Sequence, residues 1–189
     1  MKKMNCIVLA VGLIAATSTF AFAKKIGSGI SIYSVGKPYV VGGITYRPHE
    51  DPSYRVEGNA SWYGADFHGR RTANGEVYNM NAISAAHPTL PLPSYVRVTN
   101  LANHRSIVVR VNDRGPFRND RVIDVSVRVA KLIGIYERGV AQVRVEYVGR
   151  APLNASDQTK LAQTLRYELL PPFVPPAQIL SLAATEPIL

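Results

Sequence analysis

The sequence predicts a mainly β protein built around a small, closed β-barrel of mixed connectivity. Three observations support this prediction. About six short segments alternate apolar and polar residues or are rich in β-branched residues, which is typical of strands. Only one short helix is expected among them, and long irregular loops separate several of them. A chain of 189 residues is long enough for one such domain with an appendage at each end.

The N-terminus has the features of a secretory signal peptide, so we expect a periplasmic protein. Lys2 and Lys3 form a basic start, an almost unbroken apolar run covers 7–22, and a small-residue cleavage pattern ends at Ala23. The run is too short and wrongly flanked for a stable membrane span. The only cysteine, Cys6, precedes the run and is not placed as a lipidated cysteine, so no membrane anchor is expected.

The basic charge predicts an anionic partner. The formal charge is +9, and it falls to +7 when Lys2 and Lys3 leave with the signal peptide. For an exported protein, cell-wall polymer or an anionic surface fits this charge better than nucleic acid does. The four histidines show no ligand spacing, so we expect no metal and no other cofactor.

An arm over 24–58 precedes the barrel. Residues 37–46 read as two short strands joined by the turn Gly42-Gly43. Tyrosines recur along the arm. Their flat rings either stack on sugar rings or pack the hairpin against the main domain, and the sequence leaves both readings open.

The expected strands of the barrel are bounded by turn residues. They include 59–64, 95–100, 105–111, 122–125 and 139–148, and the small-residue segment 82–88 is expected to allow close approach of the backbone. Trp62, in the first strand, is assigned to the core. Ser126 is a suitable N-cap for a helix over 127–133 that Gly134 ends. Beyond the barrel, 156–168 is expected to form a helix in a tail that docks weakly or stays mobile.

Three polar side chains lie in the connections between these strands. Asp113 follows the strand at 105–111 and either caps the following turn or acts as an acid held firmly at a strand end. Glu76 follows Asn74-Gly75, a tight-turn signal that we expect to present its side chain at a loop end. His87 precedes a proline and is either a half-buried structural histidine or part of a site.

Five motifs occur in a characteristic order. They are Ala60-Ser61-Trp62-Tyr63-Gly64, Phe67-His68-Gly69-Arg70, Thr72-Ala73-Asn74-Gly75-Glu76, Ala85-Ala86-His87 and Val111-Asn112-Asp113-Arg114-Gly115-Pro116-Phe117. Together they resemble the rare lipoprotein A family of septal, endolytic peptidoglycan lytic transglycosylases. The resemblance implies a six-stranded double-psi β-barrel, denuded peptidoglycan glycan strands as substrate, and possible divisome partners.

The resemblance also implies the site residues. It places the family's functional acid, glutamate and histidine on Asp113, Glu76 and His87. Six neighbouring side chains are expected to contact the glycan: Tyr63, Phe67, Arg70, Asn74, Asn112 and Arg114. We expect Arg114 to point outward or to bind a substrate carboxylate. Glu76 would stabilise the cationic transition state or orient a sugar, and His87 would bond Asp113 or the substrate.

Departures from the family concern one loop residue and the ends of the chain. Asn79 stands where family members often carry aspartate. No lipidation site is visible, and the tail is too short for the family's peptidoglycan-binding repeat domain. The expected organisation is a signal peptide over 1–23, an arm over 24–58, the barrel domain over 59–149 and a helix with a Pro-rich tail over 150–189.

Two alternatives to a lytic transglycosylase follow from the same residues. Related barrels in expansins bind polysaccharide without cutting it, so a non-catalytic peptidoglycan binder is one alternative. The other is a hydrolase that pairs Asp113 with Glu76 or Asp124. A carboxyl separation of roughly 6.5–9.5 Å would suit inversion in that case.

Overall fold

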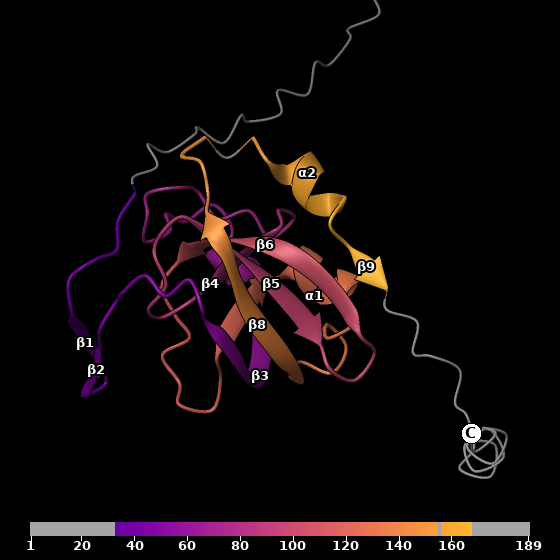
Figure 1. Cartoon of the computed structure of the whole chain (residues 1–189), viewed down its shortest axis with the longest axis horizontal. Helices are drawn as coiled ribbons and strands as arrows, with labels where there is room; N and C mark the ends of the chain where they lie inside the picture. Colours follow the sequence, from indigo (N-terminus) through magenta and orange to yellow (C-terminus); the bar gives the residue numbers. More distant parts are fainter. Residues whose placement is uncertain (1–32, 155, 168–189) are drawn as a thin grey trace, which may run out of the picture.

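The computed structural model describes residues 33–154 and 156–167 (Figure 1). The signal-peptide prediction and the prolines of the tail lie outside the described residues. Among those described, no helix is long and apolar enough to cross a membrane.

Six strands form a closed barrel, as the sequence predicts. They are β3 (Arg55–Tyr63), β4 (Ser84–Ala86), β5 (Ser94–Asn100), β6 (Arg105–Asp113), β7 (Ile123–Ser126) and β8 (Ala141–Arg150). Their order around the barrel is β4-β7-β3-β8-β5-β6, and a pairing of β4 with β6 closes the ring. Closure leaves each of the six strands paired on both sides.

The connectivity is mixed, which is also as predicted. Two pairs are parallel, β3 with β7 and β4 with β6, while the remaining pairs of the barrel are antiparallel. This is the double-psi β-barrel that the motif resemblance implies. β3 and β6 extend beyond their expected bounds, so Asn112 and Asp113 belong to the end of a strand rather than to the turn.

The barrel is filled by the side chains that alternate inward. On β6 these include Val109 and Val111, and on β8 they include Val143 and Val145, all fully buried. Trp62 lies at the edge of this core rather than in it. It is half-buried and stacks on Tyr136 at a centroid distance of 4.7 Å.

A short helix follows β7, as expected. Helix α1 (Val127–Leu132) begins at Ser126, whose Oγ accepts a hydrogen bond from the Val129 N–H. It closes near Gly134, which has a φ of 74°. A 3-10 turn, η1 (Ala65–Phe67), follows β3 and opens the long loop between β3 and β4.

The predicted N-terminal hairpin is present, and Figure 1 shows it outside the barrel. Strands β1 (Tyr39–Val41) and β2 (Ile44–Tyr46) pair antiparallel across Gly42 and Gly43, which both have positive φ. The Tyr39 hydroxyl donates to the Pro88 carbonyl at 2.7 Å, which ties the hairpin to the loop after β4.

The described part of the C-terminal segment packs against the barrel, so the prediction of weak docking is wrong for 156–167. Helix α2 (Gln158–Ala162) is shorter than expected and buries Leu161 in the core. Strand β9 (Arg166–Tyr167) then pairs antiparallel with the start of β6. The Val108 N–H also donates to Thr164 Oγ1 at 2.9 Å.

Candidate active site

Asp113 lies at the end of β6, where two carboxylates flank one small residue. Ala86 of β4 is paired with Asp113 on one side and with Asp124 of β7 on the other. Two strand spacings of about 4.8 Å place the two aspartate Cα atoms about 9–10 Å apart. The short β4 thus brings together acids that are distant in sequence.

The Asp113 carboxyl is half-buried and held by two backbone amides. Its Oδ1 accepts hydrogen bonds from the Ala73 N–H at 2.9 Å and from its neighbour Arg114 N–H at 2.8 Å. Burial raises the pKa of Asp113, although these two N–H groups and the Arg114 charge act in the opposite direction. Because both bonds fall on Oδ1, Oδ2 is the oxygen placed to carry an exchanging proton.

The turn at 72–76 lies over Asp113 and is held to β6. Thr72 Oγ1 donates to Asn74 Oδ1 at 2.8 Å, and the Asn74 N–H donates to the Asn112 carbonyl at 3.4 Å. Gly75 has a φ of 88°, which suits glycine at this tight turn. These contacts fix the backbone whose Ala73 N–H reaches Asp113.

Glu76 is buried, which corrects the prediction of a side chain presented at a loop end. Its carboxylate accepts bonds from Nε and Nη2 of Arg110, the shortest at 2.6 Å, and from the Asn112 amide at 2.8 Å. The Asn74 amide donates to it as well. Burial alone would raise the pKa of Glu76, but the bonds from Arg110, Asn112 and Asn74 outweigh it and lower the pKa.

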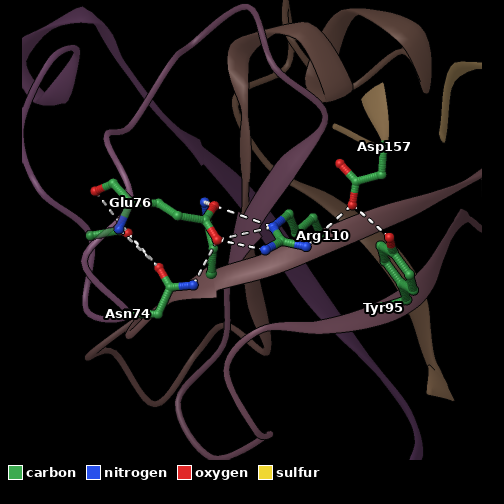
Figure 2. A network of polar contacts seen from close by, with 7 residues as sticks. Asn74, Glu76, Tyr95, Arg110 and Asp157 are labelled. Atoms are coloured by element: carbon green, nitrogen blue, oxygen red, sulfur yellow. Dashed lines mark hydrogen bonds and ion pairs between the residues drawn. The ribbon is translucent and has the colours of Figure 1, made fainter. Parts of the chain in front are cut away.

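Arg110 and Asp157 complete this network, and the sequence predictions did not include them. Figure 2 shows the Arg110 guanidinium between Glu76 and Asp157. Its Nη1 donates to Asp157 Oδ2 at 3.2 Å, and the Tyr95 hydroxyl donates to the same oxygen at 2.6 Å. A clear signal was available for Arg110, because a guanidinium among buried valines of a strand needs a carboxylate partner.

His87 is fully buried, and both ring nitrogens have partners. Nδ1 accepts the N–H groups of Thr89 and Leu90 at 3.2 and 3.0 Å, so the neutral ring carries its proton on Nε2, which lies 2.9 Å from the Tyr54 hydroxyl. Burial lowers the pKa of His87 to about 3, and Arg114 contributes to the shift. The His87 N–H donates to the Asp113 carbonyl, so the two residues are linked through the backbone.

Arg114 points inward, so the prediction that it points outward is wrong. Its Nη1 donates to the carbonyls of His87 and Leu90, and its Nη2 donates to the Val35 carbonyl at 2.9 Å. The guanidinium therefore ties the N-terminal arm and the loop after β4 to the Asp113 turn. This contact joins residues that are up to 79 positions apart in sequence.

The remaining predicted contact residues separate into buried and exposed groups. Asn74 and Asn112 are buried beside Glu76. Tyr63 packs on Tyr78 at a centroid distance of 4.2 Å, and burial raises its pKa well above the usual value. By contrast, the side chains of Phe67 and Arg70 are exposed, and the Arg70 guanidinium lies over the Phe67 ring at 5.6 Å.

A second exposed aromatic lies on the chain directly after the Asp113 turn. Phe117 is 42% exposed and packs edge-on against Tyr39 and Tyr46 of the hairpin at 6.1 and 5.7 Å. The two tyrosines stack on each other at 5.2 Å. The arm tyrosines therefore pack the hairpin against the main domain, and the Phe117 ring remains open to solvent.

Asp124 is the other carboxylate beside Ala86. Burial raises its pKa, and Arg121 opposes the shift with an Nη2–Oδ2 distance of 3.4 Å. Asp124 Oδ1 is buried and has no hydrogen-bond partner among the described residues. A second protonatable carboxyl therefore lies one strand away from Ala86.

Comparison with known proteins identifies the barrel. Residues 55–145 match the family model described as lytic transglycolase. The match to this family lies within the barrel. The rare lipoprotein A resemblance predicted from the ordered motifs is thereby confirmed, and the match covers Glu76 in its loop as well as Asp113 and the whole of β6.

Similar proteins of this family share the barrel but are longer. The endolytic peptidoglycan transglycosylase RlpA of Pseudomonas aeruginosa strain UCBPP-PA14 is 61% identical over 110 residues, which are 58% of this chain and 32% of the relative. The RlpA proteins of Neisseria meningitidis strain MC58 and Rickettsia felis are 52% and 49% identical over 61% of this chain, and they are covered to 48% and 52%. This chain thus spans a third to a half of these relatives.

Among solved structures, Streptomyces papain inhibitor aligns with 53% of this chain and 99% of its own chain. The TM-score is 0.44 and the sequence identity is 21%, a likeness too distant to bear on function.

Proposed function

We propose that this lytic transglycolase-family barrel cleaves the β-1,4 bond between MurNAc and GlcNAc in peptidoglycan, with Asp113 as the acid and base. One observation supports this above the others. Asp113 is a half-buried carboxyl with a raised pKa, both of its hydrogen bonds fall on Oδ1, and Oδ2 is left for the substrate. The relatives named endolytic peptidoglycan transglycosylase supply the substrate class.

The reaction needs only one group that gives and then takes a proton. Protonated Asp113 transfers its proton to the glycosidic oxygen while the bond from that oxygen to MurNAc C1 breaks. The MurNAc 6-hydroxyl attacks C1 and loses its proton to the Asp113 carboxylate, which closes a 1,6-anhydro ring. Because no water is consumed, a second carboxylate is not required.

The other site residues divide between holding the acid and meeting the sugar. Glu76, Asn74 and Asn112 are buried in one network, and Arg114 binds backbone carbonyls, so we assign them to the framework around Asp113. Tyr63 packs on Tyr78 and His87 bonds Tyr54, so we assign both to the same framework. Phe67, Arg70 and the exposed Phe117 are left to contact the glycan.

The finer features of the substrate follow from charge and from the family. A protein whose formal charge is +7 after Lys2 and Lys3 leave (+9 less two) attracts glycan whose MurNAc units expose lactyl carboxylates, as strands without stem peptides do. We propose such denuded strands as the preferred substrate and the periplasm as the place of action, with division-site proteins as possible partners.

Product analysis tests this function. Purified denuded glycan and intact peptidoglycan are digested, and the released ends are identified by mass. We expect 1,6-anhydroMurNAc ends from wild type, with activity falling as the pH rises through the pKa of Asp113. Asp113→Asn, which keeps the shape of the side chain, should lower kcat by about a hundredfold to ten-thousandfold. An Asp113→Asn protein that still produces anhydro ends at the wild-type rate would refute the assignment of Asp113 as the acid and base.

The same digestion separates the two alternatives. An inverting hydrolase pairing Asp113 with Asp124 is favoured by the positions of the two carboxyls on either side of Ala86, one serving as the acid and the other as the base. That enzyme would release reducing ends and would lose activity in Asp124→Asn. A non-catalytic binder would pellet with the glycan and release no new ends.

A further inference from the structure

We propose that Asp157 and Arg110 are positioning residues for Asp113, and that Glu76 acts with them through the turn at 72–76 rather than on the glycan. This inference rests on the proposed function. It assigns a role in the active site to a residue beyond the barrel strands, outside the region 55–145 that matches the family model.

The first step is the orientation of the Arg110 guanidinium. Nε and Nη2 face Glu76, and Nη1 faces Asp157 from the opposite side (Figure 2). A planar guanidinium held from two sides keeps its two-pronged contact with one carboxylate. Without Asp157, the group gains freedom to pivot, and its contact with Glu76 loses its fixed geometry.

The second step leads from Glu76 to the acid. Glu76 binds the Asn74 amide, the Asn74 N–H binds the Asn112 carbonyl, and the turn between them presents the Ala73 N–H to Asp113 Oδ1. The turn is thus fastened to β6 by Arg110 and Asn112. A shift of this turn moves the hydrogen bond that orients the Asp113 carboxyl.

The third step concerns the anchoring of Asp157. It stands directly before α2, and its Oδ2 also accepts the Tyr95 hydroxyl from β5. Segment 156–167 is itself fixed by the buried Leu161 and by the pairing of β9 with β6. Docking of this C-terminal segment therefore places the Asp157 carboxylate against Arg110, on the side opposite to Glu76.

The energetics support positioning rather than simple stabilisation. Two buried carboxylates share one guanidinium, and Asp157 Oδ1 has no hydrogen-bond partner among the described residues. Removing such charges from water costs free energy that an apolar cluster of the same size would not cost. A network of this kind contributes fixed geometry more than net stability.

Kinetics of the full chain on denuded glycan test the proposal. We expect Asp157→Ala and Arg110→Lys each to lower kcat about 10- to 100-fold with little change in KM, because the acid is misplaced while the sugar contacts remain. Arg110→Lys keeps the charge but loses the two-sided contact. The matched control is Glu57→Ala, which breaks the exposed Arg144–Glu57 pair of the barrel and should leave kcat unchanged.

Pairing the variants distinguishes a shared route from separate roles. If Glu76 and Asp157 act through the same turn, the double variant Glu76→Gln/Asp157→Ala loses no more activity than the worse single variant. Additive losses would place Glu76 directly on the substrate and would overturn the proposal.

Amide hydrogen exchange followed by NMR provides a readout that does not depend on catalysis. In Asp157→Ala we expect exchange of the Ala73 amide to become faster, while exchange of the Val109 amide in β6 stays as in wild type. If wild type releases no anhydro ends, the proposed function is refuted. The exchange of the Ala73 amide would still show whether Asp157 positions the turn at 72–76. A folded Asp157→Ala protein with wild-type kcat and wild-type Ala73 exchange would overturn this inference.

Discussion

At the scale of single residues, the Asp113 carboxyl is set up for proton transfer at a cost to the folded state. Its folded pKa is raised, so its contribution to stability is present below the unfolded pKa of about 3.9 and is lost as the pH rises through the folded pKa. Above that folded pKa, the folded protein therefore carries a half-buried charge that it would be more stable without.

This cost predicts a gain in stability from an inactivating substitution. Above the folded pKa of Asp113, we expect Asp113→Asn to unfold at a higher urea concentration than wild type, since a neutral amide avoids the burial of charge. The difference between the two proteins should shrink as the pH falls below about 4, where wild-type Asp113 is protonated in both states. Urea unfolding curves of both proteins over a pH series measure this difference in midpoint. Equal midpoints at every pH of the series would show that ionised Asp113 is not disfavoured by folding.

His87 gives a pH dependence of the opposite sign. Its pKa falls from 6.5 to about 3 on folding, so its neutral ring contributes stability above pH 6.5 that is lost as the pH falls through this range. The full loss is on the order of 5 kcal/mol by linkage.

His87→Gln tests this sign because an amide oxygen accepts the Thr89 and Leu90 N–H groups without titrating. We expect the variant to be less stable than wild type at pH 7, and its free energy of unfolding to change less between pH 7 and pH 4. The measurement is chemical unfolding at several pH values. A variant as acid-sensitive as wild type would locate the sensitive group elsewhere.

Single residues also show what the sequence does and does not predict. The strand-end position of Asp113 follows from local alternation and turn residues, and it is correct. The burial of Glu76 and the inward direction of Arg114 depend on partners 34 and up to 79 positions away, respectively. No local pattern contains such contacts. Only Arg110, a charged residue flanked by buried valines in β6, indicated that a carboxylate partner lies elsewhere in the chain.

At the scale of elements, the N-terminal hairpin and the turn after β6 build one aromatic cluster. Tyr39 and Tyr46 back the Phe117 ring, which is open to solvent close in sequence to Asp113. Such a supported ring suits the apolar face of a sugar. The sequence predicted the hairpin from Gly42-Gly43, but the partner of its tyrosines became visible only with the fold.

Substituting Phe117 tests whether the cluster binds glycan. We expect Phe117→Ala to weaken binding of denuded glycan by about three- to tenfold, because one stacking contact contributes about 0.5–1.5 kcal/mol. Equilibrium pelleting measures this loss. Tyr167→Ala is the matched control, since Tyr167 is exposed but pairs with Arg105 at the opposite end of β6, about 26 Å from Asp113. Equal losses in the two variants would refute a local glycan contact.

At the scale of the whole molecule, closure of the barrel determines the site. The pairing of β4 with both β6 and β7 joins Asp113, Ala86 and Asp124, and it is a contact between distant strands. Period-two alternation predicted six strands and a closed barrel, but it carries no information on which strands become neighbours. For the same reason, the docking of 156–167 on β6 was not predicted, although its leucine spacing was visible.

The charge of the whole molecule leads to the last prediction. The formal charge, +7 once Lys2 and Lys3 are subtracted from +9, attracts an anionic glycan over a range set by the Debye length. This length shrinks from about 30 Å at 0.01 M salt to about 8 Å at 0.15 M. We expect affinity for denuded glycan to fall steeply over this range, as measured by pelleting. Glycan with amidated lactyl groups is the control, because it should bind more weakly and with little salt dependence.

Comparing this series with the Phe117→Ala protein separates the two contributions to binding. Stacking on an aromatic ring is not screened by salt, so the variant should lose the same factor in affinity at every ionic strength. If wild type binds native and amidated glycan equally well at low salt, the positive charge does not select this substrate. Recognition would then depend on the sugar contacts near Asp113 alone.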